Sequence, residues 1–79
     1  ELTEEIRMLR ALLESTLTRR QFLVFRMLGA GFSVPDIARI LKRSTKTIEN
    51  HVTGIGRRLG ISGQASFARI AGRLYYEIP

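Results

Sequence analysis

The clearest hydrophobic pattern in the chain lies in residues 44–60, STKTIENHVTGIGRRLG. At about 100° per residue, its apolar side chains fall on one side of a helix and most polar ones on the other. Ser44 is placed to cap the first turn, and Gly60 is placed to end the helix. We therefore predict an amphipathic helix over residues 44–59. Its buried face is formed by Ile48, Val52, Ile55 and Leu59.

The opposite face of this helix is polar and is formed by Lys46, Glu49, Asn50, Thr53 and Arg57. These side chains can donate or accept hydrogen bonds, and most are too short or too charged to build a hydrophobic core. Such a face is suited to a polar partner. We interpret the segment as a recognition helix that lies in a groove of a nucleic acid.

Residues 1–16 predict a separate amphipathic helix of about four turns. Its apolar stripe needs a partner, which could be the following domain, the same helix in a second copy, or a domain upstream. Two heptads are too few to indicate a coiled coil. The stripe consists of Leu2, Ile6, Leu9 and Leu13.

A second predicted helix begins after Thr18, because Thr18 and Gln21 have the spacing of a capping box. Leu17 and Phe22 are placed for a hydrophobic staple at this start, and Gly31 is placed to follow the end of the helix. Its aromatic and methionine side chains are typical of a core rather than of a cofactor site. The inward residues are Val24, Phe25, Met27 and Leu28.

A third, short helix is predicted to begin after Ser33, with Asp36 three residues on and Pro35 in the first turn. It ends near residue 41, so only two residues separate it from the recognition helix. Two helices joined by so short a turn are typical of a helix-turn-helix motif, here over about residues 33–52. The inward residues are Ile37, Ala38, Ile40 and Leu41.

The end of the chain predicts a last helix, capped by Ser62 and running to Tyr76. One side carries the larger apolar residues Phe67, Ile70 and Leu74. A second, smaller face can either approach a second copy closely or pack on the helix of residues 1–16. This face is formed by Ala68, Ala71, Gly72 and Tyr75.

Charge is uneven along the chain, whose formal net charge is +6. Residues 1–16 carry four Glu and two Arg, whereas the remainder carries eleven basic and three acidic residues. Several of these basic residues flank the recognition helix, which is the electrostatic pattern of a phosphate-binding surface. On charge alone, a solvated basic surface without a partner is an equal alternative.

Size and composition exclude several classes of protein. Seventy-nine residues allow one small domain and leave no room for an enzyme with a deep cleft. The chain has no cysteine, which excludes disulfides and thiolate metal sites, and we expect a cytoplasmic protein. No run approaches the ~20 apolar residues that span a membrane. Because the chain begins with Glu rather than Met, we expect a further domain upstream.

The single histidine, His51, lies at the edge of the predicted apolar face, with no acidic or cysteine neighbour at ligand spacing. We therefore expect a packed, hydrogen-bonded histidine rather than a metal ligand. No pairing of a nucleophile with a base can be assembled from the other residues, so we predict neither catalysis nor a cofactor.

Residues 17–62 resemble the DNA-binding domain of LuxR-type regulators, a family that includes quorum-sensing receptors and two-component response regulators. The family pattern runs roughly L-T-x-R-E, G-x-S-x-x-E-I-A, S-x-x-T-V-x-x-H and L-G-V. The residues that fit it are Leu17, Thr18, Arg20, Gly31, Ser33, Ile37, Ala38, Ser44, Thr47, Ile48, His51, Leu59, Gly60 and Ile61.

The resemblance implies an all-α, four-helix helix-turn-helix domain over residues 17–79, preceded by the amphipathic helix of residues 1–16. It implies binding of double-stranded DNA as a homodimer, with RNA polymerase as a further candidate partner. The dimer contact would lie on the last helix, at Ala68, Ala71, Gly72 and Tyr75.

The base-reading positions of the family correspond here to Glu49, Asn50 and Thr53. Asn50 could pair with adenine, Glu49 could accept a hydrogen bond from cytosine N4, and Thr53 could contact a thymine methyl group. Basic and hydroxyl groups around the helix would bind phosphates, which position the helix without specifying sequence. The predicted phosphate-binding residues are Lys42, Arg43, Lys46, Thr47, Arg57 and Arg58.

The chain also departs from the family pattern. Gln21 stands where Glu is usual, and Lys42-Arg43 replaces Gly or Asp followed by an apolar residue, so the turn loses its easy positive-φ position. Gly54 and Gly56 are unusual within a recognition helix, because each costs about 1 kcal/mol relative to Ala. We expect the second half of this helix to be less rigid.

Two other functions remain open. Region 4 of a sigma factor contains a helix-turn-helix with a similar opening, although L-G-I-S followed by an Ala-rich last helix favours the LuxR type. The domain could instead be a protein-interaction adaptor that has lost DNA binding. The altered turn and the paired glycines would support that alternative.

Overall fold

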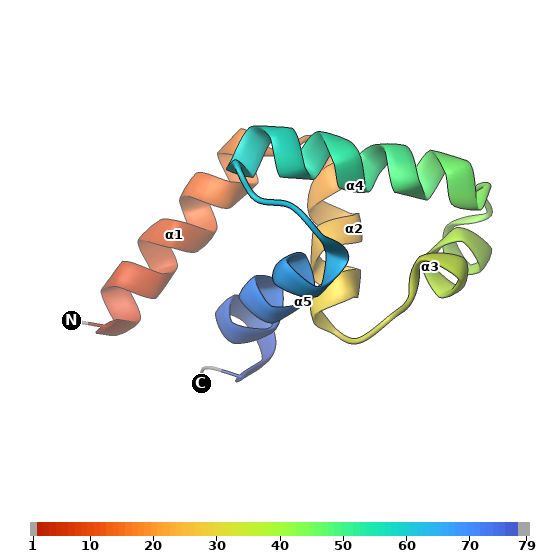
Figure 1. Cartoon of the computed structure of the whole chain (residues 1–79). Helices are drawn as coiled ribbons and strands as arrows, with labels where there is room; N and C mark the ends of the chain where they lie inside the picture. The colour runs from red at the N-terminus through yellow and green to blue at the C-terminus, as the bar shows by residue number, and fades with distance from the viewer. Residues whose placement is uncertain (1, 78–79) are drawn as a thin grey trace.

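The computed structural model describes residues 2–77, which form five α-helices and a terminal π-helical turn. This architecture confirms the predicted all-α class, and α3 and α4 form the helix-turn-helix (Figure 1). The elements in chain order are α1 (Leu2–Thr16), α2 (Arg19–Gly29), α3 (Val34–Leu41), α4 (Thr45–Leu59), α5 (Gln64–Gly72) and η1 (Arg73–Glu77).

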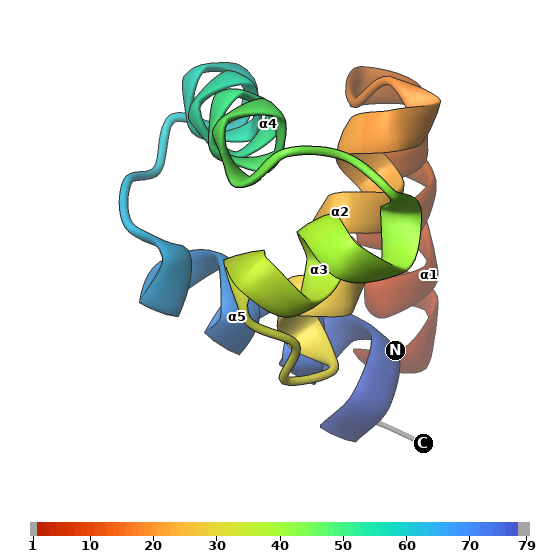
Figure 2. The same cartoon turned by 90° about the vertical axis from the view of Figure 1, so that its right-hand side faces the viewer.

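Helix α2 lies at the centre of the fold and contacts each of the other elements. Helix α4 crosses above it, α5 lies below α4, and α1 extends from the end of the molecule opposite α3 (Figures 1 and 2). The inward side chains of α2 fill the space between these helices. The largest fully buried side chains of the core are Phe25, Phe67, Ile37, Ile48, Ile55 and Val24.

Both predicted capping boxes are present. Thr18 Oγ1 accepts from the backbone N–H of Gln21 at 3.1 Å, and Gln21 Oε1 accepts from the backbone N–H of Thr18 at 3.1 Å. Ser33 and Asp36 make the equivalent pair, at 3.2 and 3.3 Å. Each box satisfies amides that the helix itself leaves unpaired, so the starts of α2 and α3 are determined locally.

Helix α1 packs on the domain along only part of its predicted stripe. Ile6 is buried and Leu13 packs against the core, but Leu9 is 49% exposed, and the side chain of Leu2 lies outside the described residues. The stripe therefore packs on the domain at Ile6 and Leu13 but not at Leu9.

Three polar contacts fasten α1 to the domain. The Arg10 side chain donates to the carbonyl of Leu74, and its guanidinium lies 5.2 Å from the ring centroid of Tyr75. The Arg58 guanidinium donates to the carbonyl of Thr16 at 2.8 Å, at the other end of α1. That carbonyl has no partner within α1 itself, because the last turn of a helix leaves its acceptors unpaired.

Helix α5 starts later than predicted. Gly63, not Ser62, precedes the first helical residue, and no side chain caps the helix. Gly63 has φ 88°, a conformation that glycine adopts without strain. The α-helix also ends at Gly72, where the chain continues as η1.

Two residues of the predicted dimer contact on the last helix, Ala71 and Gly72, are buried within the chain. Ala71 is fully buried, and a Cβ atom added at Gly29 would lie 2.4 Å from Ala71 Cβ. These small residues therefore allow α5 to approach α2 of the same molecule. Tyr75 is partly buried against the core and Ala68 is half-buried, and a dimer contact at these two residues stays a prediction.

The turn between α3 and α4 is closed by Lys42, which takes φ 56° and ψ 47°. Within residues 2–77 no other non-glycine residue has a positive φ. The turn has therefore kept the left-handed position that we expected it to lose, with a lysine where glycine would be unstrained. Next to it, the backbone N–H of Arg43 donates to the carbonyl of Ala38 at 2.9 Å.

We expect Lys42→Gly to raise the free energy of unfolding by about 1 kcal/mol, because glycine has no Cβ to strain in the left-handed region. Lys42→Ala is the matched control, since it removes the same charge and keeps the strain. Urea unfolding followed by circular dichroism gives all three stabilities. Equal stability of the glycine and alanine variants would contradict the strain at this position.

Candidate nucleic-acid interface

The predicted recognition helix is α4. Ser44 caps it, because its Oγ accepts from the backbone N–H of Thr47 at 3.1 Å. Gly60 ends it with φ 69°. Ile48 and Ile55 are fully buried, and the other two residues of the predicted apolar face are partly buried against the core. The amphipathic character of the helix is confirmed.

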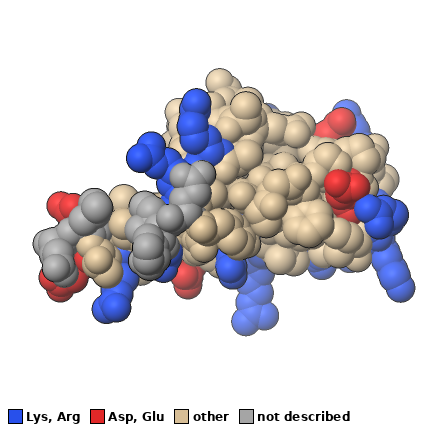
Figure 3. Space-filling model, turned by 90° about the horizontal axis from the view of Figure 1, so that it is seen from below, with Lys and Arg blue, Asp and Glu red and all other residues tan. Residues whose placement is uncertain are grey.

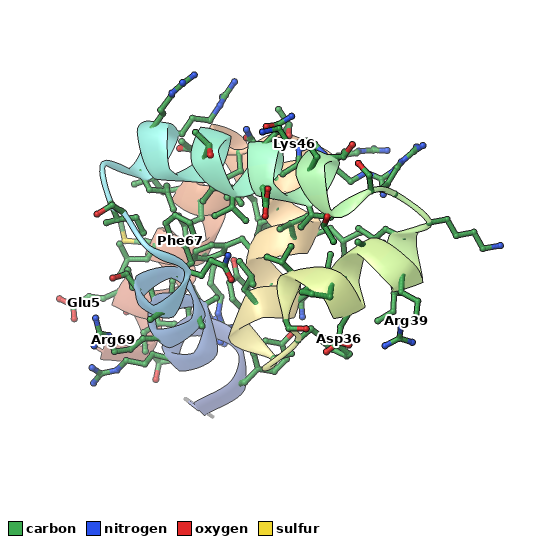
Figure 4. The ribbon with its side chains drawn as sticks, turned by 45° about the vertical axis from the view of Figure 1, so that its right-hand side comes forward. Glu5, Asp36, Arg39, Lys46, Phe67 and Arg69 are labelled. Carbon is green, nitrogen blue, oxygen red and sulfur yellow. The ribbon has the colours of Figure 1, made fainter. Side chains whose placement is uncertain are left out.

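The outer face of α4 is exposed. Figure 4 shows Lys46 on the side of α4 that faces away from the core, whereas Phe67 lies between α4 and α5. The one ion pair within residues 2–77 joins Arg39 to Asp36 on α3, so no basic side chain of α4 is held in an ion pair. The exposed residues of this face are Lys46, Glu49, Asn50, Thr53 and Arg57.

One of the three predicted base-reading residues is already hydrogen-bonded. The Thr53 hydroxyl donates to the backbone carbonyl of Glu49 at 3.1 Å. Because the hydroxyl proton is engaged within the helix, Thr53 can offer a base edge its methyl group or the acceptor lone pairs of its oxygen. Asn50 lies beside them with its side chain exposed.

The predicted phosphate-binding residues fall into two groups. Lys42 and Arg43, in the turn, are exposed beside the start of α4. Thr47 is half-buried, and its hydroxyl lies 3.0 Å from that of Ser44. Arg58 is held by the carbonyl at the end of α1, which directs its guanidinium toward α1 and leaves the outer face to Arg57.

The two glycines of α4 lie at close contacts within the chain. A Cβ atom at Gly56 would lie 2.7 Å from the backbone oxygen of Ile61 and 3.3 Å from Phe67 Cζ. A Cβ atom at Gly54 would lie 2.5 Å from Nε2 of Gln21, at the start of α2. The sequence alone could not predict these contacts. Gln21 is far from Gly54 along the chain, and Ile61 lies in the loop that follows α4.

His51 is half-buried on the side of α4. Burial lowers its pKa below the ordinary value of 6.5, and the positive charges of Arg20 and Arg43 lower it further. The hydrogen bonds between described residues do not include His51, so the expected hydrogen-bonded histidine is not found.

The fold and the exposed face of α4 are those of a DNA-binding regulatory domain of the helix-turn-helix class. The chain belongs to the luxR family of bacterial regulatory proteins, whose family model matches residues 15–71. This match favours the LuxR type over the sigma-factor alternative. Among curated proteins and among solved structures, none matches the chain significantly.

Two further observations concern residues 2–77. No helix in this part of the chain is both long and apolar enough to span a bilayer. The acidic and histidine side chains of the same residues form no cluster with the composition of a metal site.

Acidification should destabilise the domain through His51. Its pKa is lower in the folded chain, so the unfolded chain takes up a proton first as the pH falls below 6.5. Stability is therefore lost from that pH down to the folded pKa, and His51→Gln should remove this part of the pH dependence. Urea unfolding at a series of pH values measures it. Stability that rises on acidification in the wild-type chain would contradict the lowered pKa.

The two glycines of α4 should differ when each is replaced by alanine. Gly56→Ala should destabilise the domain by roughly 1–3 kcal/mol, because the new Cβ meets a backbone oxygen that cannot move alone. Gly54→Ala should cost less, because the Cβ meets the end of a flexible side chain and alanine favours the helix. Thermal unfolding compares the two, and an equal or larger loss at Gly54 would contradict the assignment.

Proposed function

We propose that this domain binds double-stranded DNA in a sequence-specific manner, as the effector domain of a bacterial transcriptional regulator, with α4 in the major groove. The observation that carries the proposal is the outer face of α4. Three hydrogen-bonding or methyl-bearing side chains lie there between exposed cations, while the opposite face is fixed in the core.

The dimensions of this face match a major groove. Lys46 and Arg57 are eleven residues apart, which corresponds to about 16 Å along a helix axis. A major groove is about 12 Å wide, so the two cations can reach phosphates on both of its sides. Lys42 and Arg43 extend the basic surface beyond the start of α4.

The three predicted base-reading residues offer different groups to the bases. Asn50 carries a donor and an acceptor, which suits the edge of adenine, and the Glu49 carboxylate can accept from cytosine N4. Thr53 can offer its methyl group to thymine, while its hydroxyl donates to the Glu49 carbonyl. The basic residues would contribute affinity and position rather than specificity.

Variants of base-reading residues and variants of phosphate-binding residues should behave differently. Fluorescence-anisotropy titrations against duplexes selected from a random library compare them. Glu49→Ala should change the preferred base at one position, whereas Arg57→Ala should weaken binding to all duplexes about equally. Arg7→Ala is the control, because it removes the same charge from exposed α1. With about six phosphates neutralised, the logarithm of the affinity should fall against the logarithm of salt concentration with a slope near −5.

Two results would contradict the proposal. If Glu49→Ala leaves the preference of the domain unchanged, Glu49 does not read a base. If the wild-type chain binds no duplex at low salt, the domain does not bind DNA on its own, and the protein-interaction adaptor becomes the better explanation.

A further inference from the structure

A groove of about 490 Å³, which we term the α1–α5 groove, lies between α1 and the segment formed by α5 and η1, below the end of α4 (Figure 1). Small-molecule sites in proteins have volumes in this range and are concave and mostly apolar. Among the described residues that line the groove, Arg73 is the one charged residue. The rest of the lining is aliphatic and includes Leu9, Leu12, Leu13, Leu59, Ile61 and Ile70.

Part of this aliphatic lining is open to solvent. Leu12 is 62% exposed and Leu9 is 49% exposed, although both line the groove. Helix α1 is fastened beside the groove by the hydrogen bonds of Arg10 and Arg58, so both sides of the groove are held in place. A ligand that covers the exposed aliphatic side chains therefore gains the hydrophobic free energy of burying them.

Positive charge lies at one edge of the groove. Arg73 is exposed on η1, and Arg69, four residues earlier, is exposed on α5. The ion pair found within residues 2–77 lies on α3, so no carboxylate in this part of the chain holds either arginine. Seen from below, uncharged residues cover the middle of the domain and charged side chains stand at its edges (Figure 3). Glu5 lines an adjoining hollow on α1, so a negative group is favoured at Arg73 and disfavoured toward the start of α1.

We propose that the α1–α5 groove binds a free straight-chain fatty acid, whose alkyl chain lies along α1 and whose carboxylate contacts Arg73. The lining suits an alkyl chain, because its described residues include no aromatic, amide or hydroxyl side chain that would recognise a base, a sugar or a peptide bond. The planar guanidinium of an arginine can donate two hydrogen bonds to one carboxylate. This proposal does not depend on DNA binding.

A ligand in the groove leaves the outer face of α4 uncovered. Leu59 and Ile61 contribute to the groove at the C-terminal end of α4, whereas the exposed polar face looks away from the core. The ligand contacts α1 on one side and α5 and η1 on the other, so its binding also holds α1 against the domain. Fatty-acid binding and an exposed α4 are therefore compatible.

Decanoate, used below the concentration at which it forms micelles, is the probe for this site. In an NMR titration of the 79-residue chain, backbone amides of residues 9–13, 59–61 and 70–74 should shift and saturate together. Decanol should bind about fivefold more weakly, because it keeps the alkyl chain and lacks the charge. Octanoate should bind at least about fourfold more weakly than decanoate, since a shorter chain buries less apolar surface. Decyltrimethylammonium, whose head group is positive, should bind more weakly than decanol.

Variants of the lining test where the ligand lies. Arg73→Gln should weaken decanoate binding about fivefold and leave decanol binding unchanged, whereas Arg19→Gln, which removes the same charge from exposed α2, should change neither. Leu9→Asp should weaken decanoate binding at least about tenfold, because a carboxylate then stands against the alkyl chain. Leu23→Asp is the matched control, because Leu23 is 40% exposed on α2 and does not line the groove.

Three results would overturn the proposal: no saturable shifts with millimolar decanoate, decanol that binds as tightly as decanoate, or decanoate binding that Leu9→Asp and Arg73→Gln both leave unchanged. Shifts spread over the whole domain would indicate detergent-like binding and would overturn it as well. Arg73 is exposed, so its variant keeps the test valid if Leu9→Asp does not fold. None of these results would bear on DNA binding by α4, which is measured separately.

Discussion

The burial of one side of α4 is the constraint on which the rest of the structure depends. Ile48 and Ile55 are seven residues apart, or about two turns, and both are fully buried. Two anchors on one stripe determine the rotation of a helix about its axis as well as its position. Because this rotation is set by the core, the polar residues on the opposite side must project from the molecule together.

The remaining helices hold α4 in that orientation from several directions. Helix α2 lies beneath it, and the glycine at position 56 allows the end of α4 to approach the loop before α5 closely. Arg58 links the same end to the last turn of α1. Lys42 adopts a left-handed conformation, which allows a short turn to join α3 and α4. These contacts fix the orientation of the polar face within the folded chain, and a preorganised face loses less entropy on binding.

Features determined by neighbouring residues could be predicted from the sequence. The capping boxes at Thr18 and Ser33 and the two faces of α4 depend on spacing alone, and the structure confirms them. Features determined by distant contacts could not. The small residues of α5 suggested a dimer contact, but Ala71 contacts α2 of its own chain. The reason for glycine at position 56 is its close contact with Phe67, which only the folded structure shows. Likewise, no sequence pattern indicated that the Arg58 side chain would donate to the carbonyl of Thr16 at the end of α1.

An NMR titration with a duplex that the domain binds shows whether the outer face of α4 contacts DNA. Backbone amide signals should shift or broaden at Lys46, Asn50 and Arg57, and the amides of the fully buried residues of α2 should change little. Perturbations confined to α1 and α5, with α4 unaffected by a duplex that binds, would show that α4 is not the DNA-binding surface.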